Sequence, residues 1–62
     1  MRIKEMRLER GFSQRQLAIK LGVSQQAIAR WEAGAAYPTA EKLPKIARAL
    51  RCTLEDLYEE SL

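Results

Sequence analysis

The sequence predicts an all-α fold of five short helices, expected as one domain over residues 1–62. Apolar residues recur at intervals of three and four along the chain, and glycines and prolines separate the apolar segments. No segment of useful length alternates between apolar and polar residues, so we expect no strand. The hydrophobic content of 47% is sufficient for a core. A chain of this size is nevertheless marginal, because it buries only about 60% of its unfolded surface.

The apolar spacing places the helices at about residues 2–10, 14–21, 25–33, 40–50 and 54–60. Four of them follow a residue that commonly caps helices, namely Ser13, Ser24, Thr39 and Thr53. The first three end at Gly11, Gly22 and Gly34. Pro44 falls in the first turns of the fourth helix, where its missing N–H bends the helix or delays its start.

The same spacing divides the apolar residues between core and surface. The expected core residues are Ile3, Met6, Leu8, Leu17, Ala18, Leu21, Val23, Ile28, Trp31, Leu43, Ile46, Ala47 and Leu50. Near the C-terminus, Leu54, Leu57, Tyr58 and Leu62 are expected to complete the core. For Tyr58 and Leu62 the alternative is a contact between two protomers.

The composition argues against several classes of function. The chain has no histidine and one cysteine, Cys52, so the commonest general base and metal ligand are missing and no intramolecular disulfide forms. No apolar run approaches the roughly 20 residues that span a bilayer, and the charged N-terminus does not resemble a signal peptide. We therefore expect a cytoplasmic protein that is not an enzyme. We expect no metal, cofactor, membrane contact or small-molecule ligand.

Basic residues are concentrated in the first half of the chain, which has a net charge of +3 overall. Residues 1–34 contain seven basic and three acidic residues, whereas residues 35–62 contain four basic and five acidic residues. A basic half favours a polyanionic partner such as nucleic acid. The alternative is an ordinary surface of mixed charge.

The second and third helices are expected to cross steeply, because only Gly22-Val23-Ser24 separates them. On the third helix, at about 100° per residue, Ile28 and Trp31 point into the core. The residues left on its outer face and exposed first turn are Gln25, Gln26, Ala29 and Arg30.

This outer face has the residue types of a surface that reads DNA bases. Glutamine pairs bidentately with adenine and arginine with guanine in the major groove. A small residue such as Ala29 lets the backbone approach the base edges or a thymine methyl group. The alternative is a set of polar residues at an exposed helix start, with Arg30 as a solvated charge or a phosphate contact.

From Leu8 to Leu57 the sequence resembles the helix-turn-helix domain of phage Cro and CI repressors and their bacterial relatives, the Xre family. The matching segments are SQRQLA, LGVS, QQAIARWE, KLPKIARAL and TLEDLY, with Gly34 and Pro38 between them. The resemblance implies a compact five-helix, lambda-repressor-like domain with its helix-turn-helix at about 14–33. It also implies that the helix at 25–33 enters the major groove while the helix at 14–21 lies across the phosphate backbone.

The resemblance also implies roles for single residues. Gln14 matches a residue that contacts phosphate and braces the side chain at Gln25, and Arg7 with Glu32 matches an internal ion pair of some members. The candidate DNA-binding residues are Gln14, Arg15, Ser24, Gln25, Gln26, Ala29, Arg30 and Tyr37.

Two departures from the family pattern affect these expectations. Many members have asparagine, glycine and a basic residue after the third helix, whereas this chain has residues 33–36, AGAA. This loss reduces the phosphate footprint, and Tyr37 is the expected replacement donor. Arg51 stands where many members have glycine, and a left-handed conformation there costs about 1 kcal/mol.

These observations predict a sequence-specific double-stranded DNA-binding transcriptional regulator, most simply a repressor that binds a palindromic operator as a homodimer. The alternative is a protein-interaction module, such as an antitoxin or an antirepressor-like partner. RNA binding is disfavoured because aromatic residues make up only 6% of the chain, too few for a surface that stacks bases.

Overall fold

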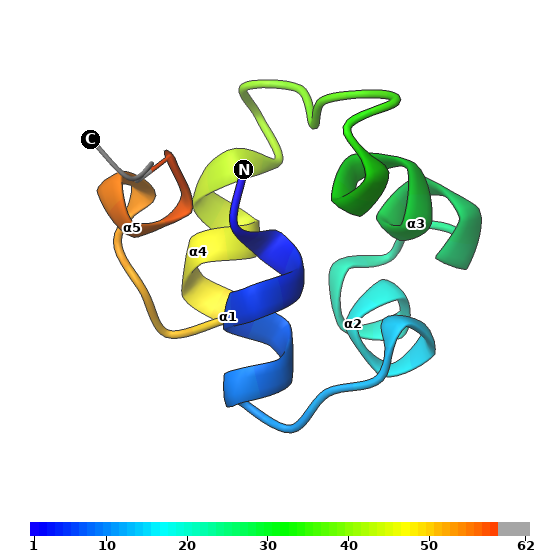
Figure 1. Ribbon diagram of the computed structural model, residues 1–62, viewed down its shortest axis with the longest axis horizontal. Coiled ribbons are helices and arrows are strands. Elements are labelled where there is room, and N and C mark those ends of the chain that lie inside the picture. Colours follow the sequence, from blue (N-terminus) through cyan, green and yellow to red (C-terminus); the bar gives the residue numbers. More distant parts are fainter. Residues whose placement is uncertain (59–62) are drawn as a thin grey trace.

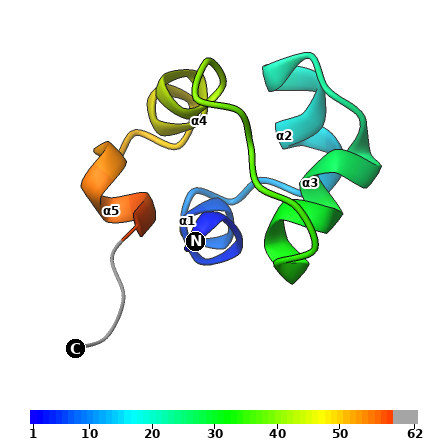
Figure 2. The same ribbon diagram turned by 90° about the horizontal axis from the view of Figure 1, so that it is seen from above.

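The computed structural model describes residues 1–58, which form five α-helices and no strand (Figure 1). The helices are α1 (Ile3–Glu9), α2 (Gln14–Leu21), α3 (Gln25–Ala33), α4 (Leu43–Ala49) and α5 (Leu54–Tyr58). In both views α1 lies between α5 on one side and α3 on the other (Figures 1 and 2). The predicted all-α fold of five helices is therefore confirmed. No helix within residues 1–58 is long and apolar enough to cross a membrane.

Three helices begin at the predicted capping residues. Ser13 Oγ accepts a bond from the Gln16 backbone N–H at 3.0 Å, and Gln16 Oε1 accepts one from the Ser13 N–H at 2.8 Å. Ser24 Oγ accepts a backbone bond from the first turn of α3 at 3.0 Å. Thr53 and Asp56 exchange two such bonds, both 3.0 Å long, at the start of α5. These side chains satisfy donors that a helix start leaves without partners.

The predicted start of α4 at residue 40 is wrong, and the helix begins at Leu43, a delay of the kind expected from Pro44. The residue before α4 is Lys42, which makes no side-chain cap, and Thr39 instead accepts a turn bond from the Lys42 N–H at 3.0 Å. Pro44 explains the difference, because it has no N–H to donate to the carbonyl of residue 40. The helix therefore cannot extend back through residues 40–42, whereas a proline in the first turn loses no helical bond.

The core contains residues from all five helices. Its buried apolar residues are Ile3, Met6, Leu17, Ala18, Ile28, Trp31, Ile46, Ala47, Leu50 and Leu57. Leu21 and Val23 are partly buried against this core, and Leu43 is half-buried.

Three apolar residues expected inside lie largely at the surface. Leu8 is 58% exposed, because at about 100° per residue it falls on the far side of α1 from Ile3. The charged Arg7 takes the buried position on α1 instead. On α5, Leu54 and Tyr58 are 41% and 52% exposed. Leu62 lies outside the described residues.

The end of α4 has a left-handed residue that is not glycine. Arg51 has a φ of 54°. Its N–H bonds to the Arg48 carbonyl at 3.2 Å, and the Cys52 N–H bonds to the Ala47 carbonyl at 2.9 Å. This pair of bonds is the Schellman ending of a helix, which glycine usually provides. The backbone of Arg51 is therefore strained, because a residue with a Cβ atom disfavours the left-handed conformation.

Truncation of Trp31 tests the core. Trp31 is 7% exposed, so its fluorescence should be blue-shifted in the folded protein and should shift to the red on unfolding. Trp31→Ala should lower the free energy of unfolding by about 3–5 kcal/mol, measured by denaturant titration. The exposed Leu8→Ala is the control and should change it by no more than about 0.5 kcal/mol. Red-shifted emission from the folded protein would contradict the burial of Trp31.

Glycine at position 51 should stabilise the protein. Arg51→Gly removes the clash of Cβ in the left-handed conformation and keeps the backbone bonds, so the free energy of unfolding should rise by up to about 1 kcal/mol. Arg48→Gly, inside α4, is the matched control and should lower it by about 1 kcal/mol. Thermal unfolding measures both changes, and destabilisation by Arg51→Gly would show that the residue is not strained.

Candidate nucleic-acid interface

A buried ion pair joins α1 to α3. Arg7 Nε donates to Glu32 Oε2 at 2.6 Å, and Arg7 Nη2 donates to Glu32 Oε1 at 3.3 Å. The two side chains are only 8% and 5% exposed. Arg7 Nη1 also donates to the Phe12 carbonyl at 2.7 Å, so the same guanidinium holds the segment between α1 and α2. A planar guanidinium makes such bidentate contacts with a fixed geometry, which orients α3 against α1.

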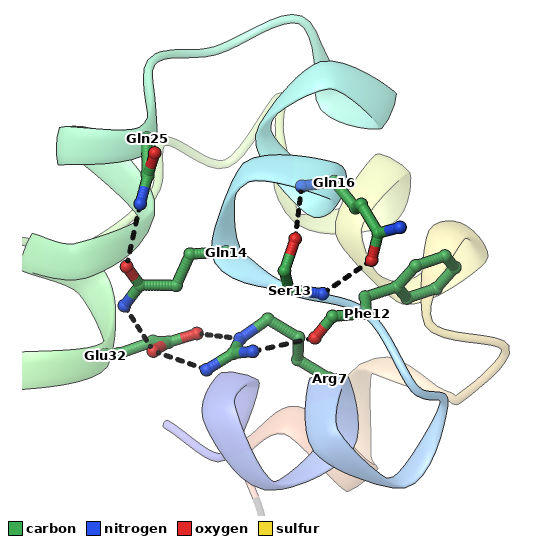
Figure 3. Close-up of polar contacts among 7 residues, drawn as sticks. All are labelled: Arg7, Phe12, Ser13, Gln14, Gln16, Gln25 and Glu32. Carbon is green, nitrogen blue, oxygen red and sulfur yellow. Dashed lines mark hydrogen bonds and ion pairs between the residues drawn. The ribbon is translucent and has the colours of Figure 1, made fainter.

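Two glutamines extend this pair to the first turns of α2 and α3 (Figure 3). Gln14 Nε2 donates to Glu32 Oε1 at 3.0 Å, and Gln25 Nε2 donates to Gln14 Oε1 at 3.4 Å. Arg7, Glu32, Gln14 and Gln25 thus form one continuous set of polar contacts, here called the Arg7–Gln25 network. Its outer end is the first residue of α3.

The charge of Glu32 determines the direction of these contacts. Burial raises the pKa of its carboxyl, but the hydrogen bonds from Arg7 and Gln14 and the charge of Arg7 lower it more. The pKa therefore lies below its usual value of 4.5, and the group is an acceptor-only carboxylate at neutral pH. The Gln14 amide must turn its N–H toward Glu32, so its oxygen is left to accept from Gln25.

The outer face of α3 lies beside the network. Gln25, Gln26 and Arg30 are exposed on it, and Ala29 is half-buried. Ser24 is exposed at the cap of this helix, where its hydroxyl oxygen accepts a backbone bond. The amide and guanidinium groups of the sequence-based candidates on α3 therefore do face solvent.

The remaining candidates lie on neighbouring segments. Gln14 is half-buried and Arg15 is exposed at the start of α2, and Tyr37 is 72% exposed in the segment after α3. Neither Arg15 nor Arg30 makes an ion pair with a carboxylate of residues 1–58. Both cations are thus available to an anion from outside the chain.

Two of the contacts that Arg7 and Glu32 make have no signal in the sequence. Arg7 donates to the backbone carbonyl of Phe12, and every residue type has such a carbonyl. The bond between Gln14 and Glu32 joins residues 18 positions apart, and the spacing of apolar residues does not predict it.

The chain belongs to the helix-turn-helix family, whose sequence model matches residues 3–57. The resemblance to this family of transcription regulators is thereby confirmed. The chain is 36% identical over 56 residues to the HTH-type transcriptional activator BcrR of Enterococcus faecalis. The aligned segment covers 90% of this chain and 28% of that relative. It is 39% identical over 57 residues to an uncharacterized HTH-type transcriptional regulator of Archaeoglobus fulgidus, covering 92% of this chain and 81% of the relative. The chain therefore spans less than a third of the first relative.

Substitution of the ion pair should reveal strong coupling between its members. Glu32→Leu leaves Arg7 buried without its carboxylate and should lower the free energy of unfolding by about 3–5 kcal/mol. The double variant Arg7→Met/Glu32→Leu should cost less than the single variant, because no uncompensated charge remains. Urea unfolding of the wild type, both single variants and the double variant gives the coupling energy.

The control for this cycle is the pair of Arg2 with Glu5 at the start of α1, whose charged atoms are 3.2 Å apart and whose side chains are more exposed than those of Arg7 and Glu32. Its coupling should fall in the range of about 0.2–1 kcal/mol typical of surface pairs. A coupling below about 0.3 kcal/mol for Arg7 with Glu32 would reduce the buried pair to a surface contact of the same kind.

The network should also make stability depend on pH. The pKa of Glu32 is lower in the folded state than its usual value of 4.5, so its contribution is present above that pH and is lost as the pH falls through the folded pKa. The wild type should therefore lose stability below pH 4.5 more steeply than Glu32→Gln, which has no such proton to bind. Urea midpoints across the acid range measure this, and parallel curves for the two proteins would contradict it.

Proposed function

We propose that the protein is a sequence-specific double-stranded DNA-binding transcriptional regulator in which α3 reads base edges in the major groove. The observation that carries the proposal is the bracing of Gln25 by Gln14 at the start of α3. This contact favours one orientation of the first exposed amide of α3 before DNA is bound. A side chain that is already ordered loses less conformational freedom on binding, which favours selective contact.

The chemistry of the braced amide fits adenine. Gln25 uses one of its two N–H groups for Gln14, so it keeps the other N–H and its amide oxygen. Adenine presents the N7 acceptor and the N6 donor in the major groove. One donor and one acceptor on Gln25 therefore match one adenine without breaking the contact to Gln14.

Further along α3, Gln26 and Arg30 are proposed to read neighbouring bases. Arg30 has the fork of donors that pairs with O6 and N7 of guanine, and Gln26 has a second amide for adenine. The small side chain of Ala29 lets this part of α3 approach the base edges. These three assignments rest on the burial of the side chains, since Gln26 and Arg30 are exposed and Ala29 is half-buried.

Four other side chains are proposed to hold the phosphate backbone. Arg15 is an exposed cation at the start of α2, and Tyr37 is an exposed hydroxyl donor. Ser24 keeps a hydroxyl proton while its oxygen caps α3. Gln14 uses one N–H for Glu32, and its second N–H has no acceptor among residues 1–58. Contacts of this kind fix the register of a protein on DNA without reading its sequence.

We further propose that residues 1–62 act as one domain in the cytoplasm and repress transcription by occupying an operator as a homodimer. One protomer offers few base contacts, and two protomers on a palindrome double them. The exposed Tyr58 on α5 supports a surface for a second protomer. No enzymatic step and no cofactor is part of this mechanism.

Base-reading and phosphate-holding residues should respond differently to substitution. Arg30→Ala and Gln26→Ala should each relax the preference at one base pair per half-site, by about 1–3 kcal/mol. Arg15→Ala should weaken binding to all sequences about equally and reduce the salt slope by about one unit. Affinities for a library of single-substituted operators, measured at fixed salt, separate the two outcomes.

The matched control for Arg30 is Lys4→Ala, which removes an exposed cation on α1. It should leave the base preferences unchanged. A uniform loss of affinity on Arg30→Ala and Gln26→Ala would show that α3 does not read bases.

A further inference from the structure

A groove with basic walls is lined by residues of α2 and α4 and of the segments that follow α1 and α4. In Figure 2, α2 and α4 lie beside each other. The charged lining residues of the groove are Arg10, Lys20, Lys45, Arg48 and Arg51. The other lining residues are apolar or glycine, and within residues 1–58 neither a carboxylate nor any residue of α3 lines the groove. We call this feature the basic groove.

Most of this positive charge is not neutralised by the described part of the chain. Lys45, Arg48 and Arg51 are exposed and make no ion pair with a carboxylate of residues 1–58. Clefts that carry one sign of charge focus the electrostatic potential and concentrate ligands of the opposite sign. The groove is therefore complementary to an anionic partner.

Two of the cations are held in place. Arg10 Nε donates to the Leu50 carbonyl at 2.7 Å and Arg10 Nη2 to the Arg51 carbonyl at 3.1 Å. Arg10 Nη1 also lies 3.4 Å from the exposed Glu9 carboxylate. Lys20 Nζ lies 5.5 Å from the centre of the Phe12 ring, a cation–π distance. Binding to groups that are already ordered costs less conformational entropy.

The apolar part of the groove indicates what kind of anion fits. Ile19 lines the groove and is 71% exposed, more than any other large aliphatic residue described. Phe12 also lines it and is half-buried. A large apolar residue of a peptide offers an exposed aliphatic side chain more apolar surface to cover than the sugars and phosphates of a nucleic-acid backbone do. Apolar contact within a charged rim is the usual construction of a protein interface.

We propose that the basic groove docks an acidic peptide segment of a partner protein, and that this segment carries at least one large apolar residue. Aspartate and glutamate of the segment pair with the cations of the groove, and its apolar residue covers Ile19. Because α3 contributes nothing to the groove, docking leaves the outer face of α3 open. The domain then links a partner protein to the DNA that α3 holds.

Titration of the whole 62-residue chain, labelled with ¹⁵N, tests this with three synthetic peptides. The first contains glutamate and aspartate with leucine at every fourth position, the second has serine in place of leucine, and the third has lysine in place of the acids. We expect the first peptide to shift the amide signals of Ile19, Lys20 and Arg48. It should bind about tenfold more tightly than the serine peptide, a difference of about 1.4 kcal/mol. The lysine peptide should not bind.

Variants with matched controls separate the groove from charge in general. Arg48→Glu and Ile19→Ser should each weaken the first peptide about tenfold, a difference of about 1.4 kcal/mol. Lys4→Glu and Leu8→Ser change an exposed cation and an exposed leucine on α1, outside the groove, and should have little effect. Circular dichroism checks that each variant is folded.

Three results would overturn the proposal: no shifts in the groove, shifts on α3 instead, or equal weakening by Lys4→Glu and Arg48→Glu. The proposal would also be overturned if a DNA duplex, but not the acidic peptide, shifted the amide signals of the groove. That result would assign the groove to phosphate binding. The outcome is independent of base reading, because Ile19→Ser should leave the operator preferences of α3 unchanged. Loss of peptide docking alone would therefore leave the proposed DNA-binding function standing.

Discussion

The buried contact between Arg7 and Glu32 is the interaction on which the arrangement of the helices depends. A charge taken out of water must be paired with good geometry, since an unpaired buried charge costs several kcal/mol. Arg7 meets that condition with two bonds to Glu32 and one to the Phe12 carbonyl. The guanidinium of Arg7 thereby joins α3 and the segment between α1 and α2 to α1. In a chain this small, with a modest core, such a contact restricts how α3 can sit against α1 and the start of α2.

The same contact connects the interior of the protein to its proposed reading surface. Glu32 is held as a carboxylate by Arg7, so Gln14 must donate to it and then accept from Gln25. An orientation set inside the domain thus reaches the first exposed amide of α3 through two hydrogen bonds. Preorganisation of this kind lets a few side chains discriminate bases, because they need not be ordered on binding. The basic groove lies outside this network and is not part of its geometry.

Local chemistry in the sequence was enough to predict most of the fold. Ser13, Ser24 and Thr53 cap the helices that follow them, because their hydroxyls satisfy nearby donors whatever the tertiary structure. Apolar spacing correctly predicts which face of α3 is buried. It wrongly predicts that Leu8 is buried, because Leu8 lies on the far side of α1 from the core. Thr39 has the side chain of a local helix cap, but α4 begins only at Leu43, because Pro44 has no N–H for a turn that starts at residue 40. The groove was not predicted, since it depends on how α2 and α4 meet.

We propose that α3 reads DNA sequence from an orientation that the interior of the domain sets. The measurement is selection of bound molecules from a random pool of duplex DNA. We expect an enriched palindrome whose half-sites lie about 34 Å, one helical turn, apart, with adenine and guanine at the positions read by glutamine and arginine. A pool that binds with a strong salt dependence but without any enriched sequence would contradict it.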